Sequence, residues 1–308
     1  MMPSPQILIQ LDSDVQPIVF DAVVAIDAGV EHLLQYGQVT ADGVRALVHG
    51  AMFTRGPDQL SATAIFIGGS DVSVGEALVA EIKQTFFGPI RVSVMLDGNG
   101  SNTTAAAAVL CAARHVDLAT VDALVLGGTG PVGQRVARLL VQAGAQVRLA
   151  SRDKSRAAET CQRLSEQIAD EQAGNGQAGN GQAGHPATRL VAVGAADLDE
   201  QLPQVNVVFG CGAAGVQLLS PQQLKQAGGV KVAIDLNAVP PEGLAGIAVT
   251  DKAVARDGRI DYGAIGVGGL KMKIHREAIR TLFTRNDLVL DAEQIFQIGR
   301  QLELARTV

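Results

Sequence analysis

The chain has 308 residues, of which 47% are hydrophobic and 18% are charged, and its formal net charge is −6. This length suits two domains better than one, and the composition is typical of a globular protein. The negative charge, with no basic stripe interleaved with aromatic residues, argues against nucleic acid as a partner. The apolar runs are too short to span a membrane, and residues 1–14 lack the features of a secretion signal.

The cysteines are few and widely spaced, at Cys111, Cys161 and Cys211. They match neither a disulfide framework nor a metal-binding motif. We therefore expect reduced, mostly buried thiols, a cytoplasmic protein and no metal centre.

Short apolar runs alternate with helical patterns over the first 115 residues. Strands are expected at residues 7–11, 63–67 and 90–96, and the last of these alternates apolar with polar residues. Strands that alternate with helices indicate βαβ units and a mainly parallel sheet.

Polar residues follow two of these strands. A helix opening near Pro17 carries Phe20 and Asp21, where Asp21 either faces a ligand or lies in solvent and complements the helix dipole. The third strand ends at Asp97, and residues 97–102 form a flexible polar loop at the edge where open α/β sheets bind ligands. A simple turn explains that loop equally well. Thr103 opens the alanine-rich helix that follows.

Residues 121–152 predict one strand–turn–helix–strand unit. An apolar run is followed by glycines in the dinucleotide-binding pattern, then by a helix that ends at Gly144 and by a second strand. The cofactor pyrophosphate would lie on the N-terminus of that helix. The expected contacts in this loop come from Gly128, Thr129, Gly130, Pro131, Val132 and Gly133.

The end of the second strand bears on the choice of cofactor. NAD-preferring folds usually place a carboxylate there, whereas this chain has Ser151 and Arg152, with Lys154 close behind. Because a guanidinium binds a 2′-phosphate through two parallel hydrogen bonds, NADP is expected, with NAD also possible. The alternative is a solvated basic turn.

Residues 154–170 predict a helix, and a glycine-rich repeat at 172–184 predicts a surface insertion. Strands follow at 189–193, 205–209 and 232–236. The second of these leads into a glycine-rich loop in which Cys211, Gly212 and Ala213 are expected near the nicotinamide half of the cofactor. Cys211 is interpreted as a packed thiol, since no base is paired with it in sequence. Asn237 lies in a stiff, proline-containing turn after the third strand.

Near the C-terminus, the glycine-rich residues 263–269 precede a helix expected from Leu270 to about residue 283. Lys271 and Lys273 would lie at its start, where the dipole disfavours cations, so at least one is expected to face a ligand unless both are solvated. His275 is interpreted as a hydrogen-bonded, partly buried residue. A last amphipathic helix begins at Asp291.

These patterns predict an α/β protein with a Rossmann-type, parallel-sheet NAD(P)-binding domain at residues 116–265 and a smaller α/β domain. Residues 1–115 would form the smaller domain, completed by the C-terminal helices of residues 266–308, and a cleft between the two domains would hold the substrate.

Five stretches together resemble the bacterial NAD(P)-dependent methylene-tetrahydromethanopterin dehydrogenases: PIVFDAVVAIDAG, FFGPIRVSVMLDGNGSNTTAAA, VLGGTGPVG, DLNAVPP and AIGVGGLKMKIHR. The resemblance spans nearly the whole chain. It implies a homo-oligomeric enzyme of one-carbon metabolism that oxidises the methylene pterin to its methenyl form by hydride transfer to NADP or NAD. It also implies that Phe20, Asp21, Asn102, Thr103 and Lys271 surround the pterin, and we add Asp97 from the polar loop.

This chemistry agrees with the absence of a triad or metal motif in the sequence. A methylene carbon between two nitrogens loses only hydride, so no base is needed to take a proton. Lys271 would bond a pterin oxygen or Asp21 and orient the substrate. Two alternatives stay open: a methylene-tetrahydrofolate dehydrogenase, and an NADP-sensing module without turnover.

Overall fold

The computed structural model describes residues 4–174 and 189–306. The chain divides into two compact units, the first made of Met1–Thr103 and Leu270–Val308, the second of Thr104–Gly269. Of the repeat expected at 172–184, the first three residues end a helix and the remainder lies outside the described residues.

The first unit is built on a parallel sheet in which five described strands lie in the order β12-β4-β3-β1-β2. Its elements are β1 (Ile7–Leu11), α1 (Val19–Asp27), β2 (His32–Tyr36), α2 (Ala41–Phe53), β3 (Thr63–Ile67), α3 (Val72–Thr85), β4 (Ser93–Leu96), β12 (Val289–Leu290) and α10 (Ala292–Arg306).

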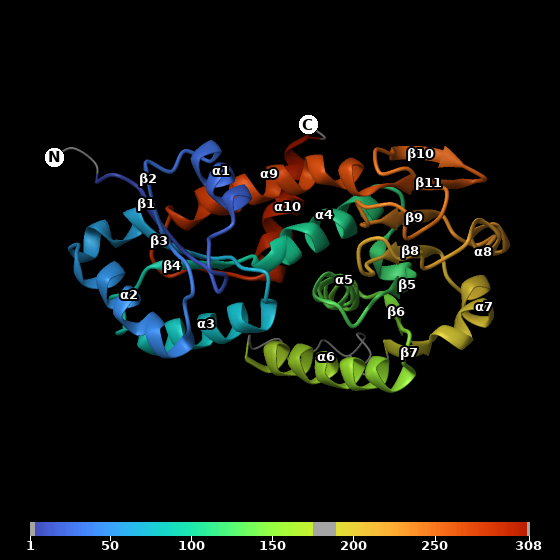
Figure 1. Cartoon of the computed structure of the whole chain (residues 1–308), viewed down its shortest axis with the longest axis horizontal. Coiled ribbons are helices and arrows are strands. Elements are labelled where there is room, and N and C mark those ends of the chain that lie inside the picture. Colours follow the sequence, from blue (N-terminus) through green and yellow to red (C-terminus); the bar gives the residue numbers. More distant parts are fainter. Residues whose placement is uncertain (1–3, 175–188, 307–308) are drawn as a thin grey trace. The chain divides into compact units, whose positions relative to one another are not determined.

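Strands β3 and β4 are wholly buried and β1 is nearly so, as expected for the inner strands of a parallel sheet. Helices α2 and α3 lie side by side (Figure 1), and their residues Val48 and Leu78 pack on Ile65 and Val94 of the central strands. Because β3 and β4 are buried on both faces, the alternation expected along residues 90–96 does not describe the strand, which is only Ser93–Leu96 and wholly buried.

Hydrophobic periodicity predicted neither β2 nor β12. Strand β2 is a mostly exposed edge strand with the sequence HLLQY, which has no clean alternation. Strand β12 has only two residues, and it is defined by its pairing with β4 rather than by any local pattern. Both are tertiary features that periodicity does not detect.

The second unit has a sheet of seven described strands in the order β10-β11-β9-β8-β5-β6-β7. All neighbours are parallel except β10 and β11. Its elements are α4 (Ser101–Ala113), β5 (Asp122–Leu126), α5 (Pro131–Gln142), β6 (Gln146–Ser151), α6 (Lys154–Gly174), β7 (Leu190–Gly194), α7 (Leu198–Gln201), β8 (Val207–Gly210), α8 (Pro221–Gln226), β9 (Val232–Asp235), β10 (Lys252–Arg256) and β11 (Arg259–Tyr262). Strands β6 and β7 lie on one side of β5, and β8 and β9 lie on the other. The strand order therefore reverses at β5, as in dinucleotide-binding folds.

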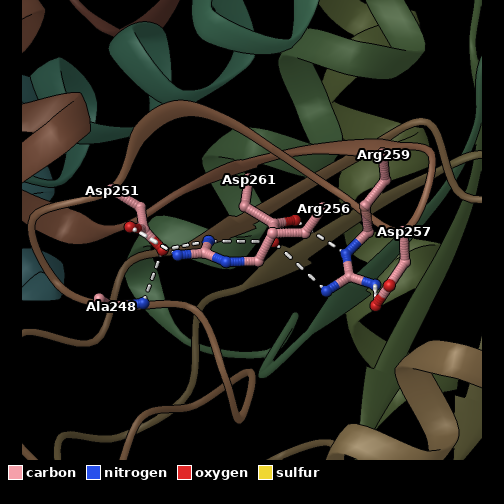
Figure 2. Close-up of polar contacts among 6 residues, drawn as sticks. All are labelled: Ala248, Asp251, Arg256, Asp257, Arg259 and Asp261. Carbon is pink, nitrogen blue, oxygen red and sulfur yellow. Dashed lines mark hydrogen bonds and ion pairs between the residues drawn. The ribbon is translucent and has the colours of Figure 1, made fainter.

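An ion-pair network fastens the β10–β11 hairpin at the edge of this sheet (Figure 2). Both carboxylate oxygens of Asp251 bind the guanidinium of Arg256, and Asp251 also accepts the backbone N–H of Ala248. Asp261 is fully buried and accepts from Arg259 at 2.8 Å. Hydrogen bonding to Arg256 lowers the pKa of Asp251. The network therefore holds the residues that lead into the next helix.

That helix, α9 (Ala264–Leu282), begins six residues earlier than the sequence predicts. The glycines at 266, 268 and 269 are helical. At Gly266 a Cβ would overlap the backbone carbonyl oxygen of Asp251, so only glycine fits there. Gly266 allows the helix to approach the loop that carries Asp251, whereas a Cβ at Gly268 or Gly269 would meet nothing within 4 Å. Lys271 and Lys273 consequently lie inside the helix and not at its start. The expectation that the helix dipole disfavours their charges is therefore wrong for both.

Within the residues that the structure describes, no helix combines the length and apolar character needed to cross a membrane.

Candidate functional site

The carboxyl ends of three neighbouring strands in the first unit bring together acidic residues. Strands β1, β3 and β4 are parallel, and they are followed by Asp12, Gly68 and Asp97. Gly68 leaves room for Asp21 of α1, since a Cβ at Gly68 would lie 3.1 Å from the Asp21 carboxylate and 3.3 Å from that of Asp12. We call Asp12, Asp21 and Asp97 the carboxylate cluster.

Asp21 is the perturbed member of this cluster. Its side chain is 5% exposed. Burial raises its pKa to about 7, the negative charges of Asp97 and Asp12 add to the rise, and Lys271 opposes it. Asp21 therefore changes protonation near neutral pH, which is unusual for a carboxyl group and typical of functional sites.

Lys271 comes to the same place from α9. Its ammonium lies 4.6 Å from the centroid of the Phe20 ring, a cation–π geometry. Phe20 is 48% exposed although it precedes the buried Asp21. Phe20, Asp21 and Lys271 thus lie together, as the resemblance implied, with an exposed aromatic ring beside a cation and a desolvated carboxyl group.

The predicted polar loop is instead a buried, ordered turn. Asp97, Asn102 and Thr103 are each 0% exposed. Asp97 accepts the backbone N–H of Asn102 at 2.9 Å and the hydroxyl of Thr103 at 2.6 Å, while the Asn102 amide donates to Asp291 at 2.9 Å. A flexible loop was therefore the wrong expectation, because these side chains satisfy one another. In this structure they support the site rather than line its surface.

His275 departs most from its sequence interpretation. It is 0% exposed, and neither ring nitrogen has a hydrogen-bond partner among the described residues. Its Nδ1 is 4.0 Å from Asp97, and its ring stacks on Phe66 with centroids 5.6 Å apart. Burial lowers its pKa to about 4, so the ring is neutral. Instead of a hydrogen-bonded, partly buried residue, His275 is a buried, neutral neighbour of the carboxylate cluster.

In the second unit, the first glycine-rich loop leaves no room for a side chain at Gly128 or Gly133. A Cβ on Gly133 would lie 2.6 Å from the carbonyl oxygen of Gly127, and one on Gly128 would lie 2.5 Å from Leu149. Pro131 is the first residue of α5, and the carbonyl of Thr129 accepts the Gln134 amide at 2.7 Å. The loop and helix start have the form that accepts a pyrophosphate.

The second glycine-rich loop lies against the first. Gly127 has a φ of +69°, and a Cβ there would be 2.6 Å from Cα of Gly212. Cys211, half-buried, donates its backbone N–H to Leu126, and burial raises the pKa of its thiol, as expected of a packed cysteine. Beside it, Ala213 is exposed. The sequence motif did not include Gly127, although its position directly after the strand was a signal for it.

Asn237 connects this second loop to the proline turn. Its side-chain oxygen accepts from Gly215 at 3.3 Å, and its amide donates to the carbonyl of Pro241 at 2.8 Å. Asn237 is therefore a brace for the loop.

At the end of β6, Ser151 is half-buried and Arg152 is exposed. Lys154 makes an ion pair of 2.9 Å with Asp197, a residue that the sequence analysis did not single out.

Three comparisons bear on the family. Residues 19–99 match the family model described as methylene-tetrahydromethanopterin dehydrogenase, N-terminal. The chain is 39% identical to the "Bifunctional protein MdtA" of Methylorubrum extorquens, over 97% of this chain and 99% of that protein. It is 30% identical to the NAD(P)-dependent methylenetetrahydromethanopterin dehydrogenase of the same organism, over 92% of this chain and 94% of that protein.

Among solved structures, quinate dehydrogenase from Corynebacterium glutamicum in complex with NAD aligns with a TM-score of 0.51 and 12% identity, covering 96% of this chain and 99% of the other. At that identity the likeness concerns the fold alone, and it confirms the Rossmann-type α/β class. The two relatives that align along nearly the full length establish more, and the chain belongs to the methylene-tetrahydromethanopterin dehydrogenase family.

Proposed function

We propose that this protein oxidises N5,N10-methylene-tetrahydromethanopterin to the methenyl form and passes the hydride to NADP or NAD. The observation that carries the proposal is the grouping of Phe20, Asp21 and Lys271 in a member of this family. The carboxylate cluster adds negative charge beside these residues, and negative charge stabilises a substrate that becomes positively charged.

The second unit fits the cofactor. Gly128 and Gly133 let the loop pack closely on Leu149 and on the carbonyl of Gly127, and α5 begins at Pro131 within the same stretch. We assign the pyrophosphate to residues 128–133, the adenosine ribose to Ser151, Arg152 and Lys154, and the nicotinamide half to residues 211–213, braced by Asn237. When bound, the nicotinamide accepts the hydride.

The residues of the first unit bind and orient the pterin. Phe20 offers an exposed ring face on which a flat heterocycle stacks. Lys271 donates hydrogen bonds to a pterin oxygen, and Asn102 and Thr103 hold Asp97 beneath the site. Since hydride alone leaves the carbon, no side chain relays a proton.

Asp21 acts through its charge. The methenyl product carries a cation shared between two nitrogens, and an ionised carboxylate at this position stabilises it as it forms. With a pKa of about 7, Asp21 changes from mostly protonated to mostly ionised as the pH rises through neutrality. We therefore expect kcat/KM for oxidation to rise with pH through about 7.

Replacing Lys271 tests its role as an orienting group and as a charge near Asp21. We expect Lys271→Met to lower kcat/KM by about 10- to 100-fold through loss of a charged hydrogen bond. Removing the cation also lets the pKa of Asp21 rise, so the pH limb of activity moves to higher pH. Lys271→Arg should restore the pH limb in part. Full kcat/KM in Lys271→Met would refute the assignment.

The direct test of the function is a spectrophotometric assay of NADP and NAD reduction with each of two pterins. Turnover with methylene-tetrahydromethanopterin supports the proposal. Turnover with methylene-tetrahydrofolate alone identifies the folate enzyme instead. Cofactor binding with no reduction by either pterin identifies a sensing module.

We further propose that the enzyme works in the cytoplasm as a homo-oligomer. The cytoplasmic assignment is supported by Cys161 and Cys211, which are free thiols.

A further inference from the structure

The ends of β6 and β7 lie side by side at the edge of the second unit where the adenosine ribose is assigned. Ser151 is in register with Gly194, the last residue of β7. The ribose 2′ position of a dinucleotide meets the end of the second strand in this fold, which here is β6. Groups at the end of β7 are therefore neighbours of the 2′ substituent.

Asp197 occupies this neighbouring position and is held in place. Its Oδ2 accepts the backbone N–H of Gly194 at 3.1 Å, and the same oxygen binds the Lys154 ammonium at 2.9 Å. The aliphatic stem of Lys154 lies against Gly194, where an added Cβ would be 3.2 Å from the Lys154 Cβ. The Lys154 hydrogen bond is the main cause that lowers the pKa of Asp197, so Asp197 is ionised at neutral pH.

This pairing changes what the basic residues offer to a cofactor. Arg152 is exposed, but Lys154 is bound to a carboxylate. A 2′-phosphate must draw Lys154 away from Asp197 and also meets the Asp197 charge, which repels it. A 2′-hydroxyl is neutral and can donate to a carboxylate, as the acidic residue of NAD-binding folds allows.

We propose that Asp197 is a cofactor-specificity residue, which weakens the binding of NADP by holding Lys154 and so narrows the difference in affinity between NADP and NAD. The inference rests on the proposed function, because it takes the end of β6 as the ribose site. Asp197 thus places a negative charge near Arg152 and Lys154, and it comes from the turn that follows β7 instead of from the end of β6.

The test is the binding of NADP and of NAD, measured by calorimetry on the full chain. Asp197→Asn keeps an oxygen for the Gly194 N–H but loses the charge. We expect the Kd for NADP to fall about fivefold, with a change of less than about twofold for NAD. Lys154→Met should weaken NADP alone, and the double variant should show that the two substitutions are coupled for NADP and not for NAD.

Glu81→Gln is the matched control, since Glu81 forms an exposed ion pair with Arg45 at 3.2 Å in the first unit. It should leave both Kd values unchanged. If Asp197→Asn changes the two Kd values by the same factor, or changes neither, the inference is wrong. If the unsubstituted protein binds neither nucleotide, the cofactor assignment of the proposed function has failed instead.

Discussion

Asp21→Asn should make the enzyme more stable at pH 8 and far less active. In the folded protein the Asp21 carboxyl holds its proton to about pH 7, whereas in the unfolded chain it ionises near 3.8. The free energy of unfolding therefore falls as the pH rises between these values. Above pH 7 the full loss, up to about 4 kcal/mol, is present. A neutral asparagine removes this penalty, while loss of the charge that stabilises the methenyl cation lowers kcat/KM by about 100-fold.

Two measurements separate this functional role from a structural one. Thermal unfolding should show a gain for Asp21→Asn at pH 8 that shrinks towards pH 4, and the pH limb of kcat/KM near 7 should disappear. Asp27→Asn is the matched control, because Asp27 ends the same helix with a side chain 53% exposed. It should change neither quantity measurably. An Asp21→Asn variant that is less stable at pH 8, or fully active, would contradict the role.

Gly266→Ala should strongly destabilise the second unit. The new methyl group would overlap the carbonyl oxygen of Asp251, and its next neighbours are backbone atoms as well, which cannot rotate away as a side chain can. That carbonyl accepts the N–H of Gly263 at 2.9 Å, and the Asp251 side chain is bound by Arg256, so the loop is held from two sides. We expect a loss of about 3 kcal/mol or more, at the upper end of overpacking costs.

Gly268→Ala provides the comparison, two residues further along the same helix. A Cβ there has nothing within 4 Å. Because alanine favours a helix over glycine, this variant should be more stable by up to about 1 kcal/mol. Denaturant unfolding of both variants measures the difference. Equal effects would show that helix propensity, rather than the approach to Asp251, determines which residues fit here.

Strand and helix types were largely accessible from the sequence because they depend on local patterns. Buried apolar runs marked β1, β3, β5 and β8, and glycine spacing located the start of α5. The glycines before Lys271 suggested a loop, whereas they are helical, and Gly266 is required by the approach of Asp251 from another segment. No local pattern encodes a contact of that kind.

In the candidate site, too, residue types could be predicted from the sequence, but the contacts between distant segments could not. Asp21 and Lys271 could be named from a resemblance, but the raised pKa of Asp21 depends on Asp97 and Asp12, which only the parallel strand ends bring near. Burial of His275 without partners and the pairing of Lys154 with Asp197 arise from tertiary neighbours too. Sequence identifies residue types, whereas the fold determines what charge each one carries.

The sheet of the first unit takes its strands from both ends of the chain. Strand β12 pairs with β4, Val94 donates to the carbonyl of Leu288, and Ser93 donates to that of Arg285. In the second unit, all strands within the described residues come from residues 122–262. During synthesis, this continuous segment is translated before Lys271 and before β12, so β4 is still an open edge when the last of these strands has been made. A chain that ended near residue 270 would therefore keep every described strand of the second unit but lack Lys271 and the strand that pairs with β4.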